Sequence, residues 1–75
     1  MQPPAFDRID VDPGVLSGQP VVRGTRLPVY VIVEAIAAGD AVTDLLRAYP
    51  FLTEDDVREA LGFAARLSKG GLEVV

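Results

Sequence analysis

The sequence contains neither cysteine nor histidine. Disulfides are therefore excluded, and so are the usual ligands of zinc and other transition metals. The same absences remove the side chains that most often act as nucleophile or general base, and Ser17 and Ser68 have no partner to activate them. No phosphate-binding glycine motif or nucleotide fingerprint is present. The sequence predicts a protein that is not an enzyme, with no cofactor, no metal site and no small-molecule substrate.

The chain is short for its apolar content. It has 75 residues, of which 49% are hydrophobic, and it forms one small domain over residues 1–75. A single core of this size supplies no more than a few kcal/mol of net stability, and small proteins usually add a disulfide, a metal or a partner subunit. Since the first two are excluded, the composition predicts oligomerisation, with a homodimer as the simplest form.

Acidic residues outnumber basic ones. Seven lysines and arginines against eleven aspartates and glutamates give a formal charge of −4. Such a charge repels nucleic acid, so any DNA contact must come from a local patch. The first ten residues lack the apolar segment of a signal peptide. The longest apolar run, residues 27–38, contains Glu34 and is too short to span a bilayer. We therefore expect a cytoplasmic protein with no membrane contact.

The first third of the chain is predicted to be β. In "FDRIDVD", Ile9 and Val11 alternate with charged residues, as in a half-buried strand. Turn signals follow at "DPG" and "SGQP", and "VVRGTR" is interpreted as a second strand. Gly24 inside that strand indicates a bulge or a close approach of backbone.

After Pro28 the apolar residues recur at helical spacing. Pro28 suits a first helical turn, Gly39 ends that helix, and Asp40 is a candidate cap for a short second helix that stops at Pro50. Thr53 and Asp56 resemble a capping box for a third helix that ends at the glycines 70–71. The predicted fold class is α+β: a two-stranded β-arm (1–27), a three-helix, helix-turn-helix-like bundle (28–69) and a short tail (70–75).

The segments "IDVDPGVLSGQPVVRGTRLPVYVI" and "AAGDAVTDLLRAYPFLTEDDVREAL" resemble the DUF433 family over residues 9 to about 66. The resemblance implies a homeodomain-like, helix-turn-helix-like fold with an N-terminal β-arm. It also implies the antitoxin half of a VapBC-type pair, whose toxin is a PIN-domain-like ribonuclease. Such a protein would be a homodimer that binds its own operator DNA and its toxin.

Arginines in and near the arm are the main binding candidates. Arg23, Thr25 and Arg26 could contact DNA phosphates or an acidic partner, since guanidinium groups bind phosphates in bidentate fashion. Alternatively, the two arginines are architectural and pair with Asp10, Asp12 or the acidic start of the third helix. The surrounding prolines and glycines favour the architectural role.

The third helix begins with "EDD", and carboxylates at that place would be repelled by DNA phosphates. Basic contacts to DNA, if made, are therefore expected from other residues, doubled by a dimer: Arg8, Arg23, Arg26 and Arg47. The aromatic residues Tyr30, Tyr49 and Phe51 are expected in the core rather than as base-stacking platforms.

The arm over residues 6–26 is the predicted dimer contact, by strand pairing or exchange, because open edge strands and isolated ribbons are unfavourable. The expected interface residues are Ile9, Val11, Val21 and Val22. Two functions remain open: a DNA-binding antitoxin and autoregulator, or a homodimeric protein-interaction module that does not bind DNA.

Overall fold

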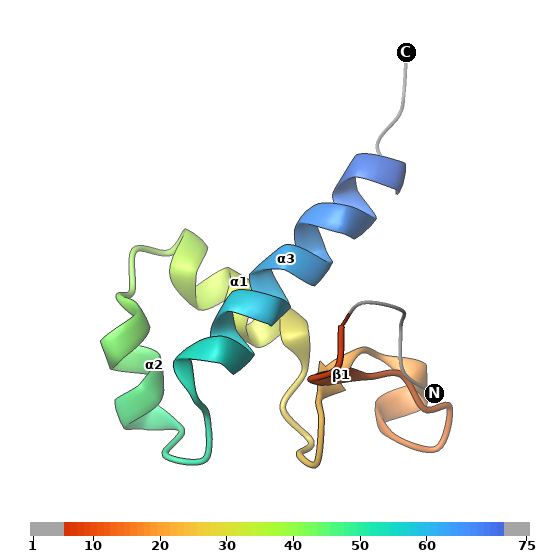
Figure 1. The fold of residues 1–75 in the computed structure, drawn as a ribbon, viewed down its shortest axis with the longest axis horizontal. Coiled ribbons are helices and arrows are strands. Elements are labelled where there is room, and N and C mark those ends of the chain that lie inside the picture. The colour runs from red at the N-terminus through yellow and green to blue at the C-terminus, as the bar shows by residue number, and fades with distance from the viewer. Residues whose placement is uncertain (1–5, 72–75) are drawn as a thin grey trace.

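The computed structural model describes residues 6–71 and places a small two-stranded sheet beside three helices (Figure 1). The α+β fold class predicted from the sequence is confirmed. The elements in chain order are β1 (Ile9–Asp10), a 3₁₀ turn (Leu16–Gly18), β2 (Val21–Val22), α1 (Val29–Ala37), α2 (Val42–Ala48) and α3 (Glu54–Gly71). Residues 1–5 of the predicted arm and 72–75 of the predicted tail lie outside the described residues.

The β-ribbon is shorter than predicted. β1 and β2 are antiparallel, with Ile9 opposite Val22 and Asp10 opposite Val21. The interpretation of "VVRGTR" as one strand is wrong, because β2 ends at Val22 and the chain then turns.

The turn after β2 is closed by the Thr25 N–H, which donates to the Val22 carbonyl at 3.0 Å. Gly24 has φ of 77°, a left-handed conformation that glycine adopts without steric cost. The turn brings the chain back alongside β2. There the Val22 N–H donates to the Leu27 carbonyl at 3.0 Å, and Pro28 pairs with Val21 in an isolated antiparallel β-bridge. The glycine therefore serves a turn and not a bulge.

The end of α1 is fixed by Gly39, as predicted. Its φ is 104°, and its N–H donates to the Ile36 carbonyl while the Asp40 N–H donates to that of Ala35, both at 3.0 Å. These two bonds make a Schellman motif. Asp40 is consequently not the cap of α2. Ala41 holds that position, and its N–H donates to the Asp44 carboxylate at 2.8 Å.

The start of α3 carries the predicted capping box. The Asp56 N–H donates to Thr53 Oγ1 at 3.1 Å, and the Thr53 N–H donates to Asp56 Oδ2 at 2.9 Å. Leu52 before the cap and Val57 in the first turns are both buried, consistent with the hydrophobic staple that accompanies such boxes. α3 then continues through both terminal glycines to Gly71, slightly beyond its predicted end.

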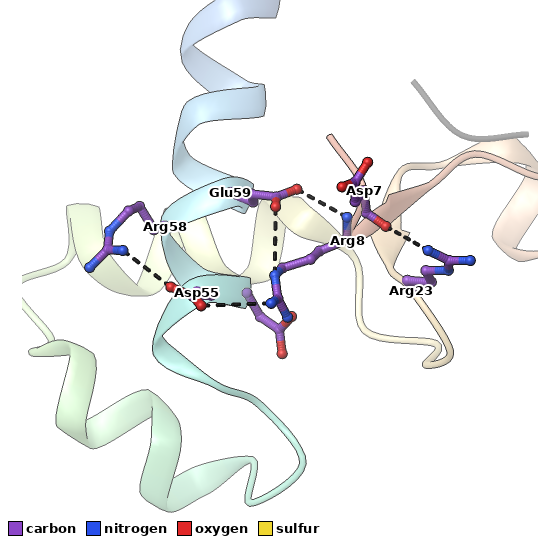
Figure 2. A pocket seen from close by; sticks show the side chains of 7 residues that line it. Asp7, Arg8, Arg23, Asp55, Arg58 and Glu59 are labelled. Atoms are coloured by element: carbon purple, nitrogen blue, oxygen red, sulfur yellow. Dashed lines mark hydrogen bonds and ion pairs between the residues drawn. The ribbon is translucent and has the colours of Figure 1, made fainter. Parts of the chain in front are cut away.

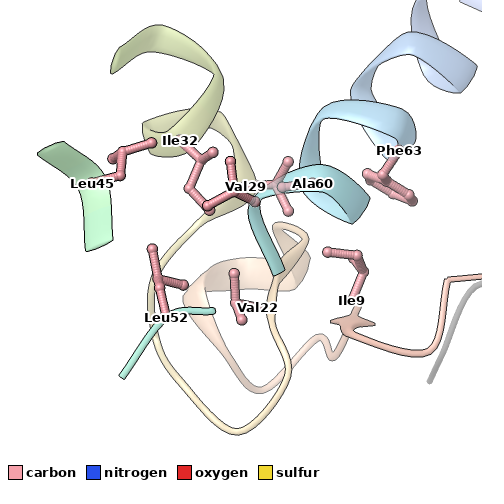
Figure 3. Packing of buried hydrophobic residues seen from close by; sticks show 9 residues of the cluster. Ile9, Val22, Val29, Ile32, Leu45, Leu52, Ala60 and Phe63 are labelled. Atoms are coloured by element: carbon pink, nitrogen blue, oxygen red, sulfur yellow. The ribbon is translucent and has the colours of Figure 1, made fainter. Parts of the chain in front are cut away.

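The core consists of apolar side chains from the ribbon and from all three helices (Figure 3). Its fully buried members include Ile32 of α1 and Val57 of α3. Partly buried hydrophobic side chains such as Phe6 pack around it, and the Phe6 ring lies edge-on to Phe63 with centroids 5.4 Å apart. The ribbon therefore forms one wall of the core.

This packing bears on the predicted dimer interface. Ile9, Val21 and Val22 are exposed by only 0%, 3% and 2%, and Ile9 and Val22 belong to the chain's own core cluster. Val11 is half-buried. Three of the four expected interface side chains are thus covered by their own chain, and a dimer contact through the arm stays a prediction.

Two glycine substitutions should change stability in opposite directions. Gly39→Ala meets no atom within 4 Å but must adopt φ of 104°, so we expect a loss of about 1 kcal/mol. Gly62→Ala lies inside α3, and its added Cβ would be 3.6 Å from the Phe6 ring, an ordinary contact. We expect that change to stabilise by about 0.5–1 kcal/mol, because alanine favours helix. Urea unfolding of both variants measures this, and equal signs would contradict the described backbone.

Candidate functional site

The side chain of Arg8, just before β1, points at the first turns of α3 (Figure 2). Its Nη1 lies 3.2 Å from Asp56 Oδ1, its Nη2 3.6 Å from Asp55 Oδ2, and its Nε 3.6 Å from Glu59 Oε2. The Arg8 backbone N–H also donates to Glu59 Oε1 at 3.0 Å. One residue thus binds three carboxylates of α3 and fixes the ribbon to the bundle.

Asp56 is the central carboxylate of this cluster. It is 8% exposed, and within residues 6–71 it is the charged residue that is buried. A buried carboxylate needs partners to compensate for its lost hydration. Asp56 has them, since it accepts from the Thr53 N–H and from Arg8, and no buried side-chain polar atom of the described part lacks a partner. Its role is therefore structural.

Arg23 lies on the other side of Arg8. Its backbone N–H donates to the Arg8 carbonyl at 2.7 Å, and its Nη1 donates to the Asp7 carbonyl at 3.1 Å. Arg58 pairs with Asp55 at 3.1 Å on the exposed side of α3. Together with the cluster around Arg8, these side chains line an open depression of about 750 Å³. Four carboxylates and three guanidinium groups line it, so the charge of its lining does not favour a phosphate.

The remaining predicted contact residues are placed elsewhere. Thr25 Oγ1 donates to the Val22 carbonyl at 2.8 Å and accepts from the Leu27 N–H at 3.0 Å, which stabilises the turn. Arg47 pairs with Asp44 at 3.8 Å on the exposed face of α2. Arg26 is exposed, and no ion pair to it is found within the described residues. Of the candidates, the depression brings together Arg8 and Arg23.

The architectural role falls partly on another arginine. Arg8 binds the acidic start of α3, whereas Arg23 secures the arm through the Asp7 carbonyl. The alternation of strand side chains gave no signal for Arg8, because it turns Ile9 towards the core and the neighbouring residue away from it.

A second surface feature is apolar. A groove of about 210 Å³ lies between α1 and α3, beside the loop before β2. Tyr30 and Leu67 border this groove, and their exposed fractions are 52% and 57%. The complete lining is Gln19, Pro20, Val29, Tyr30, Val33, Phe63, Ala64 and Leu67.

The aromatic residues were all expected in the core, and the structure places only one of the three there. Tyr49 packs against the core as predicted. Tyr30 and Phe51 do not, since both are more than half exposed, and Phe51 makes a tilted contact with Tyr49 at a centroid distance of 6.0 Å. The exposure of Leu67 near the end of α3 could not be predicted, because sequence periodicity does not show where the opposing core ends.

Within residues 6–71 no group of three acidic side chains is arranged to hold a metal ion. No described helix is both long enough and apolar enough to cross a membrane.

Comparison with known proteins identifies the family. The family model described as "Protein of unknown function (DUF433)" matches residues 9–64, which include the ribbon, α1, α2 and the core-facing part of α3. The chain belongs to the DUF433 family.

Two relatives of the chain extend beyond the region that it matches. The chain is 46% identical over 60 residues to "Uncharacterized protein y4eO" of Sinorhizobium fredii, covering 80% of this chain and 27% of that protein. It is 33% identical to a DUF433 member protein from Anabaena variabilis whose crystal structure superimposes with a TM-score of 0.78, covering 84% of this chain and 62% of that one. The chain thus spans about a quarter of the first relative and under two thirds of the second.

Arg8 should contribute more to stability than the other arginine at the acidic helix start. Arg8→Met removes the partner of the buried Asp56, and we expect a loss of about 1–2 kcal/mol. Arg58→Met removes an exposed pair, for which we expect less than about 0.5 kcal/mol. Thermal and urea unfolding of both variants measure the difference; equal losses would contradict the structural role of Arg8.

Proposed function

We propose that this DUF433 chain is a non-enzymatic, homodimeric protein-interaction module that does not read DNA with α3. The observation that carries the proposal is the apolar groove between α1 and α3, where Leu67 and Tyr30 are more than half exposed. Exposed large apolar side chains beside an apolar groove are typical of an association surface.

The charges on α3 support the part of the proposal that this helix does not read DNA. In a helix-turn-helix protein, the first turns of the second helix face base edges in the major groove. Here those turns carry Glu54, Asp55 and Asp56. Arg8 offsets part of this charge, but it is itself bound to the carboxylates and is not free to contact a phosphate. The start of α3 therefore repels DNA.

A second candidate function is the antitoxin and autoregulator of a VapBC-like pair, which binds operator DNA and a PIN-like ribonuclease. The observation in its favour is the exposed Arg26 on the turn after β2, where a dimer would present two copies to a DNA backbone. Its toxin would be the product of an adjacent gene, and co-expression followed by affinity capture tests that pairing.

The homodimer is tested by the solution mass. Light scattering at micromolar concentration should return twice the chain mass of 8.0 kDa. The complex is expected to persist in high salt, because an apolar interface is not screened as ion pairs are. A monomer mass throughout the micromolar range would contradict the proposal.

DNA binding separates the two candidates. For the interaction module we expect no change in the fluorescence anisotropy of labelled upstream DNA, at low or high salt. The antitoxin alternative predicts binding that weakens steeply with salt. It also predicts that Arg26→Ala weakens binding, with Arg58→Ala, which removes an arginine already paired with Asp55, as the matched control. Salt-sensitive binding that depends on Arg26 would favour the antitoxin over the module.

A further inference from the structure

The core-facing stripe of α3 becomes exposed along the helix. Ala60 is 0% exposed and Phe63 8%, whereas Leu67, one turn further on the same face, is 57% exposed. The reason is visible in the fold, because the last turns of α3 extend beyond the other elements (Figure 1). Leu67 thus continues a buried stripe at a place where residues 6–71 leave it more than half exposed.

The groove that borders Leu67 has a wall supplied by α1. Val29 and Val33 form its inner part and Tyr30 its outer edge, and most of its lining residues are apolar. The chain therefore carries an apolar projection, the Leu67 side chain, next to an apolar hollow, the α1–α3 groove.

We propose that two copies pack face to face about a twofold axis, with Leu67 of each copy seated in the α1–α3 groove of the other, against Tyr30. The proposal rests on the proposed homodimer and specifies its interface. It places the contact away from the β-arm, since Ile9, Val21 and Val22 of the arm are buried within their own chain.

A second copy is the occupant that the surface fits best. An isologous interface requires one patch to be complementary to itself, and here projection and hollow occur on the same patch of one chain. Charge adds to this. Arg66 precedes Leu67, and Glu34 follows Tyr30 by one helical turn; both are exposed, with no ion pair found within the described residues. Each copy thus brings a cation beside its projection and an anion beside its hollow.

The first experiment compares two exposed apolar residues. Leu67→Glu places a charge in the proposed interface, and Phe51→Glu, at 55% exposure on the α2–α3 turn, is the matched control. We expect Leu67→Glu to raise the dimer dissociation constant at least about 30-fold in sedimentation equilibrium, since the burial of two leucines is lost. Phe51→Glu should leave it within about threefold. Unchanged circular dichroism establishes that both variants fold.

The second experiment tests which residues meet. Tyr30→Lys should also weaken the homodimer, because it places a charge in the hollow that receives Leu67. A mixture of the Leu67→Glu and Tyr30→Lys chains should nevertheless associate. In that heterodimer one contact is a glutamate–lysine pair and the other keeps the original leucine and tyrosine.

The outcomes distinguish this inference from the function on which it rests. A wild-type chain that is monomeric overturns both. A wild-type dimer that neither Leu67→Glu nor Tyr30→Lys weakens overturns the inference and leaves the homodimeric module standing. Failure of the mixture to associate, when each variant alone is weakened, also overturns the pairing of Leu67 with Tyr30.

Discussion

The contact between Arg8 and Asp56 joins the two parts of this small fold. Asp56 caps α3 through the Thr53 N–H, and the same buried carboxylate accepts from the Arg8 guanidinium. A helix start is electropositive, so a carboxylate there is stabilised even before it is paired. Its second oxygen is then free to hold the segment that leads into β1. The Asp56 side chain thereby caps the start of α3 and positions the ribbon that covers the core.

This contact decides which surfaces are left for function. Arg8 holds the ribbon against α3, and Ile9 and Val22 are buried in the core of their own chain. The acidic first turns of α3 are likewise engaged within the chain. Among the described residues no such ion-pair cluster holds the far end of α3, and there the apolar stripe is exposed at Leu67.

The features that sequence could predict are those determined within a few residues. The capping box of Thr53 and Asp56 and the stop at Gly39 each depend on neighbours no more than five positions away, and both were predicted correctly. Arg8 and Asp56 are 48 positions apart, and only the fold shows that they meet. The extent of β2 was not predicted although its contacts are local: the turn at Gly24 ends the strand and brings Pro28 back to Val21. The depression and the groove could not be predicted, since each is lined by segments that lie far apart in the sequence.

The length of α3 relative to the body explains why a stable core and an exposed stripe coexist. The residues of α3 that face α1, α2 and β1 end near Phe63, yet the helix continues to Gly71. An isolated two-turn extension gains little from helix formation alone, because helices in proteins are stabilised chiefly by packing of an apolar face. Leu67 supplies such a face, and Arg66 beside it keeps the flank polar. Packing against a second chain would therefore stabilise the extension itself, so that association and the order of this helix end are coupled.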